Sequence, residues 1–411
     1  MSDDVLVVGG GIEGYSAALS ALDADPSASV RVLSRDMDRF ATETGLIDLL
    51  GYEPDGSGPI ENPLSAIDRL PEAHPYSQIG VETIRNAFAL FDDAAGGRYA
   101  GAETETNALF PTAVGRVAPA IRYPQSMANG VLSGPQSMRL VGFTEVVDFD
   151  AELAADRLDE TTRLDVSGRT MDAPLSAETV TELATALDEN SVVDGQPARE
   201  AFADALEPTL DVQPRIGLPA VLGESETAAI MDALEEQLYV SVFEVPLGPP
   251  SLPGRRLRSL LADTVESRGG TVDSVTELDG AEQSDGQIER VRADGDSYEA
   301  DSYVLATGGA KSGGLLGEAG ELREPVFDCP VSEAGEQFVD EHFLGDHPAV
   351  RAGVETDDSL RPVDSQESAV AKNLYAAGRV LESPNVVADH AAGGFALVTG
   401  YEAGRRANEQ S

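Results

Sequence analysis

The chain has 411 residues, enough for two domains, with 73 acidic and 28 basic side chains and a formal net charge of −45 at pH 7. Charge of this sign disfavours nucleic acid and anionic membrane surfaces as partners, and the single cysteine, Cys329, excludes an internal disulfide and a cysteine-ligated iron–sulfur cluster or structural zinc. The acid excess is spread along the chain and only Lys311 and Lys372 are lysines, which is typical of the solvated surface of a halophilic protein. With no basic leader and no apolar stretch near the ~20 residues of a membrane-spanning helix, we expect a cytoplasmic protein.

The first predicted element is a strand, a turn and a helix that carry a glycine fingerprint. An apolar run over 5–8 leads into Gly9, Gly11 and Gly14, and a helix of small and apolar residues follows over 15–22. In such a fingerprint the first glycine allows a tight turn, the second lets a phosphate approach the backbone, and the third lets the helix pack against the strand. The free N–H groups and the positive end of the helix dipole favour an anion. The pattern therefore predicts a nucleotide-binding βαβ unit.

The second strand lacks the acid that usually follows this fingerprint. In NAD and FAD sites an Asp or Glu about 20 residues further on binds the adenosine ribose. Here the strand over 29–33 is followed by Ser34, Arg35 and Asp36, and a serine is a poor substitute for a carboxylate that binds two hydroxyls. We interpret this as a site that grips no adenosine ribose, so that the cofactor is a mononucleotide flavin. Two alternatives stay open: Asp36 or another carboxylate supplies the ligand, or the site holds nothing.

The middle of the chain predicts an insertion. Residues 51–63 are rich in Gly and Pro and predict a linker, and over 64–249 short helical runs alternate with Pro-bearing loops and strand-like pieces. This pattern predicts an inserted α+β domain that serves as a cap for substrate or partner, within an α/β fold that has a Rossmann-like FAD/NAD(P)-binding domain. The Rossmann-like domain would consist of residues 1–63, 250–330 and 365–411, with 331–364 as a connecting segment.

Two later segments are predicted to return to the cofactor. A helix over 255–267 and three strands end in Thr307, Gly308 and Gly309, where small residues let the backbone lie against a bound cofactor. A glycine pair at the start of the last long helix can point the positive end of that helix at a flavin and stabilise its anionic reduced form. The residues assigned to cofactor binding in the last segment are Gly378, Arg379, Gly393, Gly394 and Phe395. Ordinary turns and helix packing are the alternatives.

Histidines and arginines supply the candidates for chemistry. His390 precedes the glycine pair, so it is the candidate to exchange a proton at the cofactor, with a structural role as the alternative. Arg116 and Arg122 follow a turn and are candidates to bind an anion such as a phosphate, with ion-pair arginines as the alternative. We take His390 and Arg116 as the candidate catalytic residues. The remaining histidines are His74, in a Pro-flanked loop, and His342 and His347, whose spacing suits a metal but lacks supporting ligands.

Several stretches resemble a known family nearly from end to end. They are the fingerprint itself, the hydroxyl–Arg turn at Ser34 and Arg35, Thr44-Gly45-Leu46-Ile47-Asp48-Leu49-Leu50, Leu109-Phe110-Pro111-Thr112-Ala113-Val114-Gly115, Ala377-Gly378-Arg379-Val380 and the Ala-Gly-Gly helix start. The chain resembles the flavoproteins with two dinucleotide-binding domains, and within them the B subunits of anaerobic glycerol-3-phosphate dehydrogenases. The resemblance adds Thr44 and Gly45 to the expected cofactor-binding residues.

The resemblance implies a peripheral subunit on the cytoplasmic face that uses FMN, with FAD as the alternative. It implies an FAD-bearing A subunit and a cysteine-rich iron–sulfur C subunit as partners. Together they would oxidise sn-glycerol 3-phosphate to dihydroxyacetone phosphate and pass electrons to a quinone or another respiratory acceptor. Two other functions stay open: a stand-alone FAD-dependent oxidoreductase of another small substrate, and a flavin-free scaffold that holds the other subunits.

Overall fold

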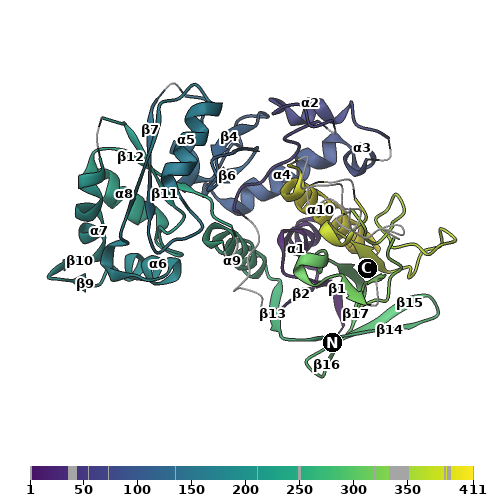
Figure 1. Cartoon of the computed structure of the whole chain (residues 1–411). Helices are drawn as coiled ribbons and strands as arrows, with labels where there is room; N and C mark the ends of the chain where they lie inside the picture. The colour runs from purple at the N-terminus through teal and green to yellow at the C-terminus, as the bar shows by residue number, and fades with distance from the viewer. Residues whose placement is uncertain are drawn as a thin grey trace.

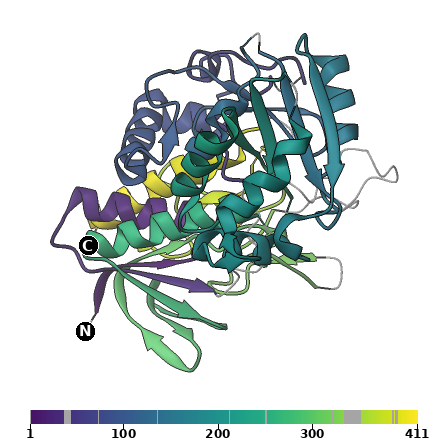
Figure 2. The ribbon, with the colours of Figure 1, turned by 90° about the vertical axis from the view of Figure 1, so that its left-hand side faces the viewer.

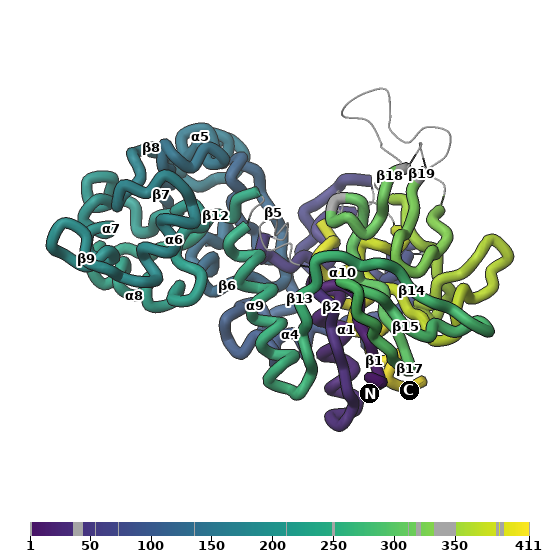
Figure 3. Tube along the Cα trace, turned by 90° about the horizontal axis from the view of Figure 1, so that it is seen from below, coloured from purple at the N-terminus to yellow at the C-terminus, as the bar shows by residue number. Residues whose placement is uncertain are grey.

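The computed structural model describes residues 2–35, 44–53, 55–72, 74–134, 136–210, 212–248, 251–318, 321–332, 351–383, 386 and 390–410. These residues form two lobes that lie side by side (Figure 1, Figure 3). One lobe is built from both ends of the chain and the other from its middle, and each lobe has its own cluster of buried apolar side chains.

The first lobe contains a five-stranded sheet in which all neighbouring strands are parallel, in the order β13-β2-β1-β17-β20. Its strands are β1 (Asp3–Val8), β2 (Val30–Arg35), β13 (Thr271–Val275), β17 (Ala300–Leu305) and β20 (Leu374–Ala376). Residues 5–8 of β1 are fully buried, as a continuous apolar run predicts for a central strand. Because all five strands run the same way, their carboxyl ends meet at one edge of the sheet. The Rossmann-like α/β fold that the sequence predicts is confirmed.

Three long helices cover one face of this sheet (Figure 2). They are α1 (Ile12–Ala24), α9 (Leu252–Ser267) and α10 (Ala392–Gln410). Helices α1 and α10 pack so closely that a Cβ on Gly404 would overlap the backbone of Ala17, and Ser16 Oγ donates a 2.7 Å hydrogen bond to the carbonyl of Leu397. This packing ties the last helix of the chain to the first.

An antiparallel meander packs against β17. Its strands are β14 (Leu278–Ser284), β15 (Gln287–Ala293) and β16 (Asp296–Tyr298). The sequence predicted three strands, over 271–278, 287–293 and within 297–309. The second agrees with β15, whereas the first supplies β13 of the parallel sheet, the third contains both β16 and β17, and β14 was not predicted. The hydroxyl of Tyr303 on β17 donates to the carbonyl of Glu289 at 2.8 Å, and the side-chain amide of Asn373 donates to the carbonyl of Ile288 at 3.0 Å. These bonds fix the meander to the two strands that end beside the glycine segments.

Helix α4 (Val81–Ala95) belongs to the first core. Its apolar face, with Ile84, Phe88 and Phe91, is buried in the same cluster as α1 and α10. The sequence-based division assigned residues 64–249 to the insertion as a whole. The structure differs at the beginning of that range: α4 belongs to the first lobe, because its apolar face packs against the helices of that lobe.

The second lobe is a four-stranded sheet in the order β12-β11-β7-β8, and its neighbouring strands are parallel. Its elements are β7 (Met138–Phe143), α5 (Ala151–Thr161), β8 (Val166–Met171), α6 (Val180–Glu189), α7 (Ala198–Leu206), β11 (Arg215–Pro219), α8 (Thr227–Leu238) and β12 (Ser241–Val245). The sequence predicted an α+β insertion, whereas the structure has a parallel α/β sheet there. Helices α5 and α8 each connect two adjacent strands, and such a crossover makes the two strands parallel.

Short elements complete the described part of the chain. They are α2 (Pro63–Ile67), α3 (Pro75–Ile79), β3 (Tyr99–Ala100), β4 (Ala108–Pro111), β5 (Val117–Ala120), β6 (Tyr123–Pro124), η2 (Gln125–Gly130), η3 (Pro174–Ser176), β9 (Val192–Val193), β10 (Gln196–Pro197), η4 (Glu207–Thr209), η5 (Ala310–Ser312), β18 (Leu316–Glu318), β19 (Glu321–Arg323) and η7 (Gly378–Val380). Among the helices that the structure describes, we find none with the length and apolar character required to cross a membrane.

Candidate functional site

The fingerprint forms a tight turn at the carboxyl edge of the first sheet. Gly9 has a φ of 134°, and a Cβ at this position would overlap the carbonyl oxygen of Ala306, which directly follows the neighbouring strand β17. A Cβ on Gly14 would overlap the carbonyl oxygen of Gly9. Both positions therefore require glycine, the first for the turn and the second for the close approach of α1 to β1.

The later glycine segments lie at the same edge of the sheet. A Cβ built onto Gly309 would lie 2.8 Å from the carbonyl oxygen of Arg379, so the segments after β17 and β20 are in contact. Oε1 of Glu13, in the first turn of α1, lies 3.7 Å from the position that a Cβ on Gly308 would occupy. The structure thus brings together three segments that are far apart in the sequence. The assignment of their glycines to a cofactor remains a prediction.

Two polar groups at this edge can still receive a ligand. Thr307 is 8% exposed, and its Oγ1 is buried without a hydrogen-bond partner among the residues that the structure describes. The guanidinium of Arg35 donates to the carbonyl of Ser312 at 2.7 Å, and burial lowers the pKa of Arg35. An orphaned hydroxyl and a half-buried cation beside glycine-lined backbone suit a polar, anionic molecule such as a flavin nucleotide. The residues therefore fit the cofactor that the sequence predicts.

Ser34 lies beside the fingerprint, as expected for the end of β2. Ser34 is 8% exposed, and a Cβ built onto Gly10 would overlap its Oγ, so the serine packs directly against this glycine. The expected acid is therefore replaced by a buried hydroxyl at this point. Asp36, the alternative ligand for the ribose, lies outside the described residues, as do His342 and His347.

The start of α10 is capped from within the chain. The N–H of Gly393 donates to Oδ1 of Asp48, and the N–H of Gly394 donates to the backbone carbonyl of the same residue, each at 2.6 Å. Burial raises the pKa of Asp48, while the hydrogen bond from Gly393 and the charge of His390 oppose this shift. The sequence reasoning missed this role, although an acid inside the apolar stretch 46–50 was the available signal. Binding of flavin by Gly393, Gly394 and the buried Phe395 stays a prediction.

His390 and two tyrosines surround this helix start. His390 has a φ of 47°, its carbonyl accepts the N–H of Gly51 at 3.0 Å, and its ring lies 5.3 Å from the ring of Tyr52. The buried hydroxyl of Tyr76 donates to the carbonyl of Ala391 at 3.0 Å. His390 is therefore close to Asp48 and α10, and its catalytic role stays a prediction.

His74 has a structural role. Its Nδ1 accepts the N–H of Tyr76 at 3.1 Å and caps α3, and burial lowers the pKa of His74 to about 4. The imidazole is therefore neutral near pH 7, and its acceptor nitrogen is already used.

Gly45 lies against the start of α9, and Thr44 precedes it in an exposed position. A Cβ on Gly45 would lie 2.7 Å from the ring of Pro253 and 3.3 Å from that of Pro124, so this turn joins α9 to β6. The Oγ1 of Thr44 accepts the N–H of Leu46 at 3.4 Å. Their contact with a cofactor remains a prediction.

The two candidate arginines differ in their surroundings. Arg122 is buried, forms a two-point ion pair with Asp92 at 2.6 and 2.8 Å, and lies 5.3 Å above the ring of Phe88. It also donates to the carbonyls of Gly101 and Ile121. This agrees with the ion-pair alternative. Arg116 is exposed at the β4–β5 turn, where its backbone N–H donates to the hydroxyl of Thr112 at 3.0 Å, and its catalytic role stays a prediction.

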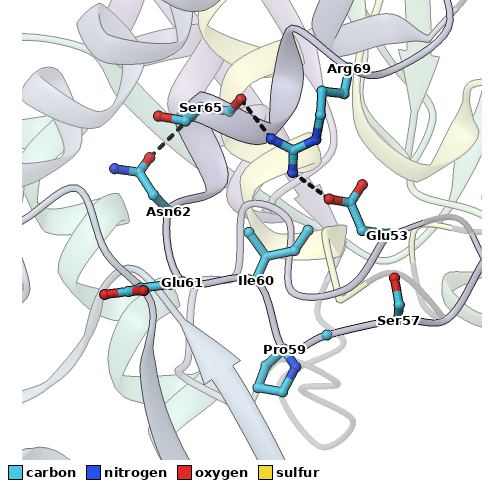
Figure 4. Close-up of a pocket in the computed structure, with 9 residues that line it drawn as sticks. Glu53, Ser57, Pro59, Ile60, Glu61, Asn62, Ser65 and Arg69 are labelled. Carbon is cyan, nitrogen blue, oxygen red and sulfur yellow. Dashed lines mark hydrogen bonds and ion pairs between the residues drawn. The ribbon is translucent and has the colours of Figure 1, made fainter.

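Cavities also lie away from the glycine edge. A cleft of about 670 Å³ runs between α8 and α9, where the lobes meet. A pocket of about 360 Å³ is lined by residues on both sides of α2. Figure 4 shows that its polar side chains are engaged within the chain: Arg69 pairs with Glu53, and Asn62 accepts the backbone N–H of Ser65 at 3.0 Å. Within the described ranges no group of acidic, His and Cys side chains is arranged to hold a metal ion.

Comparison with known proteins identifies the family. A family model described as FAD binding domain matches residues 4–395. The probable B subunit of the anaerobic glycerol-3-phosphate dehydrogenase of Halobacterium salinarum is 40% identical over 100% of this chain and 98% of the relative. The corresponding B subunit of Aliivibrio fischeri is 26% identical over 100% of this chain and 96% of the relative. A 3-ketosteroid delta1-dehydrogenase from Sterolibacterium denitrificans covers 100% of both chains with 10% identity and a TM-score of 0.46. The chain therefore belongs to the FAD binding domain family and, within it, to the family of anaerobic glycerol-3-phosphate dehydrogenase B subunits.

Proposed function

We propose that this chain is the flavin-bearing B subunit of a complex that oxidises sn-glycerol 3-phosphate to dihydroxyacetone phosphate. The main support is the meeting of three glycine segments, Arg35 and the orphaned Thr307 hydroxyl at one sheet edge, in a chain 40% identical to a protein named as such a subunit. Electrons would pass to a quinone or another respiratory acceptor.

We propose FMN as the cofactor. A dinucleotide needs a ligand for its adenosine ribose at the end of the second strand. The described end of β2 offers Ser34 and Arg35 there, a hydroxyl and a cation in place of a carboxylate. FAD is the alternative, because the family model that matches the chain is described by that cofactor.

The residues of this chain would bind and orient the flavin and keep water away from it. A bound flavin supplies reversible uptake of electrons. Backbone N–H groups of the fingerprint and the Arg35 guanidinium would hold its phosphate, and the Thr307 hydroxyl would bond a polar group of the cofactor. His390, next to the half-buried Asp48, is the candidate to hold or move a proton.

We propose that the chain works with an FAD-bearing A subunit and an iron–sulfur C subunit. The single cysteine of the chain supports this division, since a cluster needs several thiolate ligands from another subunit. Attachment at the cytoplasmic face of the membrane would come through such a partner. Arg116 remains a candidate contact for an anion.

The complex provides the test of this function. The chain would be tagged, expressed with its two proposed partners in molar salt, and purified through the tag. We expect dye reduction that depends on sn-glycerol 3-phosphate from the complex and none from the chain alone. Substrate oxidation by the isolated chain with bound FAD would instead favour the stand-alone oxidoreductase. Activity of the A and C subunits without any flavin on this chain would favour the scaffold.

A further inference from the structure

The start of α10 extends beyond the N-terminus of α1. A Cβ on Gly400 would overlap the carbonyl oxygen of Glu13, near the start of α1. One turn later, a Cβ on Gly404 would overlap the carbonyl oxygen of Ala17, so the two helices run in the same direction. Helix α10 begins at Ala392, eight residues before Gly400, which corresponds to about 12 Å of helix. Its N-terminus therefore lies on the side to which a flavin would extend from a phosphate held by the fingerprint.

A segment of the chain itself covers this helix start. A Cβ on Gly393 would lie 2.9 Å from Oδ1 of Asp48, and a Cβ on Gly394 would lie 2.6 Å from the backbone carbonyl oxygen of Asp48. The Cα atoms of Ile47 and Leu49 lie 3.2 Å and 2.9 Å from the same two positions, in that order. The glycine pair therefore makes room for the backbone around Asp48.

The N–H groups at the start of α10 are bound within the chain. Gly393 donates to the side chain of Asp48, and Gly394 donates to its backbone carbonyl. The N–H of Ala391 donates to a backbone carbonyl at 2.8 Å. Burial raises the pKa of the Asp48 carboxyl group, and the N–H groups of Gly393 and Ala392 oppose this shift. The first N–H groups are the ones that a helix can offer to a ligand, and here they have acceptors already.

The carboxyl group of Asp48 also acts against the helix dipole. The aligned peptide groups of a helix place about half a positive charge at its N-terminus. A carboxylate that is hydrogen-bonded there carries a full negative charge, so the pair leaves no net positive potential for an anionic ligand. The sequence predicted that the positive end of α10 stabilises the anionic reduced form of a flavin. The contacts of Asp48 argue against that role.

We propose that Asp48 takes the positive end of α10 away from the flavin and thereby keeps the affinity of the chain for the anionic reduced flavin low. This inference rests on the proposed function, because it presumes that the chain binds a flavin. A flavin whose reduced form is bound less tightly has a lower midpoint potential, so it gives up its electron pair more readily. Asp48 would act as a positioning residue that favours the passage of electrons to a partner subunit.

The test measures the midpoint potential of the flavin on the full-length chain. The wild type, D48N and D48A would be titrated with dithionite and reference dyes in molar salt at about pH 8.5, where an ordinary imidazole is neutral. We expect the ratio of the affinities for reduced and oxidised flavin to rise about tenfold in D48N, which is an upward shift of about 30 mV for a two-electron couple. D48A should shift further, because it also releases the N–H of Gly393.

The matched control is D150N, because Asp150 caps α5 in the second lobe by accepting the N–H of Leu153 at 3.0 Å. Its flavin potential should equal that of the wild type. D48N keeps an acceptor oxygen for Gly393, so the test does not depend on the folding of D48A.

The contrary outcomes are distinct. An unchanged or lower potential in D48N, or an equal rise in D150N, would overturn the inference and leave the proposed function standing. A wild-type chain that binds neither FMN nor FAD, with its fold verified by circular dichroism, would overturn the proposed function together with the inference.

Discussion

The N–H of Gly393 donates a 2.6 Å hydrogen bond to Oδ1 of Asp48, which lies 345 positions earlier in the chain. This bond places a carboxylate at the positive end of α10 and ties the 44–50 turn to the last helix of the first lobe. A half-buried acid that caps a helix start is expected to matter for stability, because its loss leaves the N–H of Gly393 without its acceptor.

Replacement of Asp48 tests this cap. D48A should lower the free energy of unfolding by about 1–2 kcal/mol, since the half-buried N–H of Gly393 loses its acceptor. D48N keeps an oxygen in place and should lose less. Urea unfolding at constant high salt measures both, and equal stability of D48A and the wild type would contradict the capping role.

The ion pair of Arg122 and Asp92 leads to a second prediction. R122A should lower the free energy of unfolding by about 3 kcal/mol, because it leaves the Asp92 carboxylate without its partner in a largely buried setting. The control is R85A, whose pair with Glu105 is exposed and should cost less than about 1 kcal/mol. A stable R122A with weakened phosphate binding would instead restore the anion-binding interpretation.

The neutral His74 predicts a pH effect. Burial lowers its pKa from 6.5 to about 4, so between these values the unfolded chain takes up a proton that the folded chain does not. The contribution of His74 to the free energy of unfolding is therefore largest above pH 6.5. It decreases as the pH falls toward 4, by at most about 1.4 kcal/mol for each pH unit.

H74N isolates this effect from the many carboxylates, because its amide oxygen can accept the N–H of Tyr76 without titrating. Between pH 7 and pH 5 the free energy of unfolding of the wild type should decrease more than that of H74N. A difference that stays constant over this range would show that His74 is not held neutral.

The orphaned hydroxyl of Thr307 predicts a specific loss of cofactor affinity. T307V keeps the shape of the side chain and removes a group without a described partner, so stability should change by less than about 1 kcal/mol. Flavin binding should weaken by about five- to tenfold if the hydroxyl bonds the cofactor. S302A is the matched control, because Ser302 Oγ is also buried without a described partner, inside β17 away from its end. Equal flavin affinity in T307V and S302A would remove Thr307 from the site.

The sequence predicted the first lobe well for a physical reason. A glycine fingerprint after an apolar strand requires a parallel βαβ unit, and strands that run parallel deliver their following loops to one edge. The position of Ser34 and Thr307 at that edge could therefore be predicted from the sequence. Of the meander, only β15 followed closely from its alternating pattern, because the predicted strand over 271–278 became β13 of the parallel sheet and β14 was missed.

Other features depend on contacts that no local pattern encodes. The apolar face of α4 fits either lobe by composition, and only its packing against α1 and α10 assigns it to the first. The parallel order of the second sheet depends on which strands are neighbours. Asp48 appears in the sequence as a single acid in an apolar stretch, and its position at the start of α10 arises from a contact 345 positions away.

The identity of the flavin on the purified chain tests the central claim most directly. The chain would be purified in molar salt, its visible spectrum recorded, and the cofactor released by denaturation and separated by chromatography. The account predicts a flavin spectrum and release of FMN. A colourless chain that also fails to take up added flavin would contradict it, and release of FAD would contradict the choice of a mononucleotide.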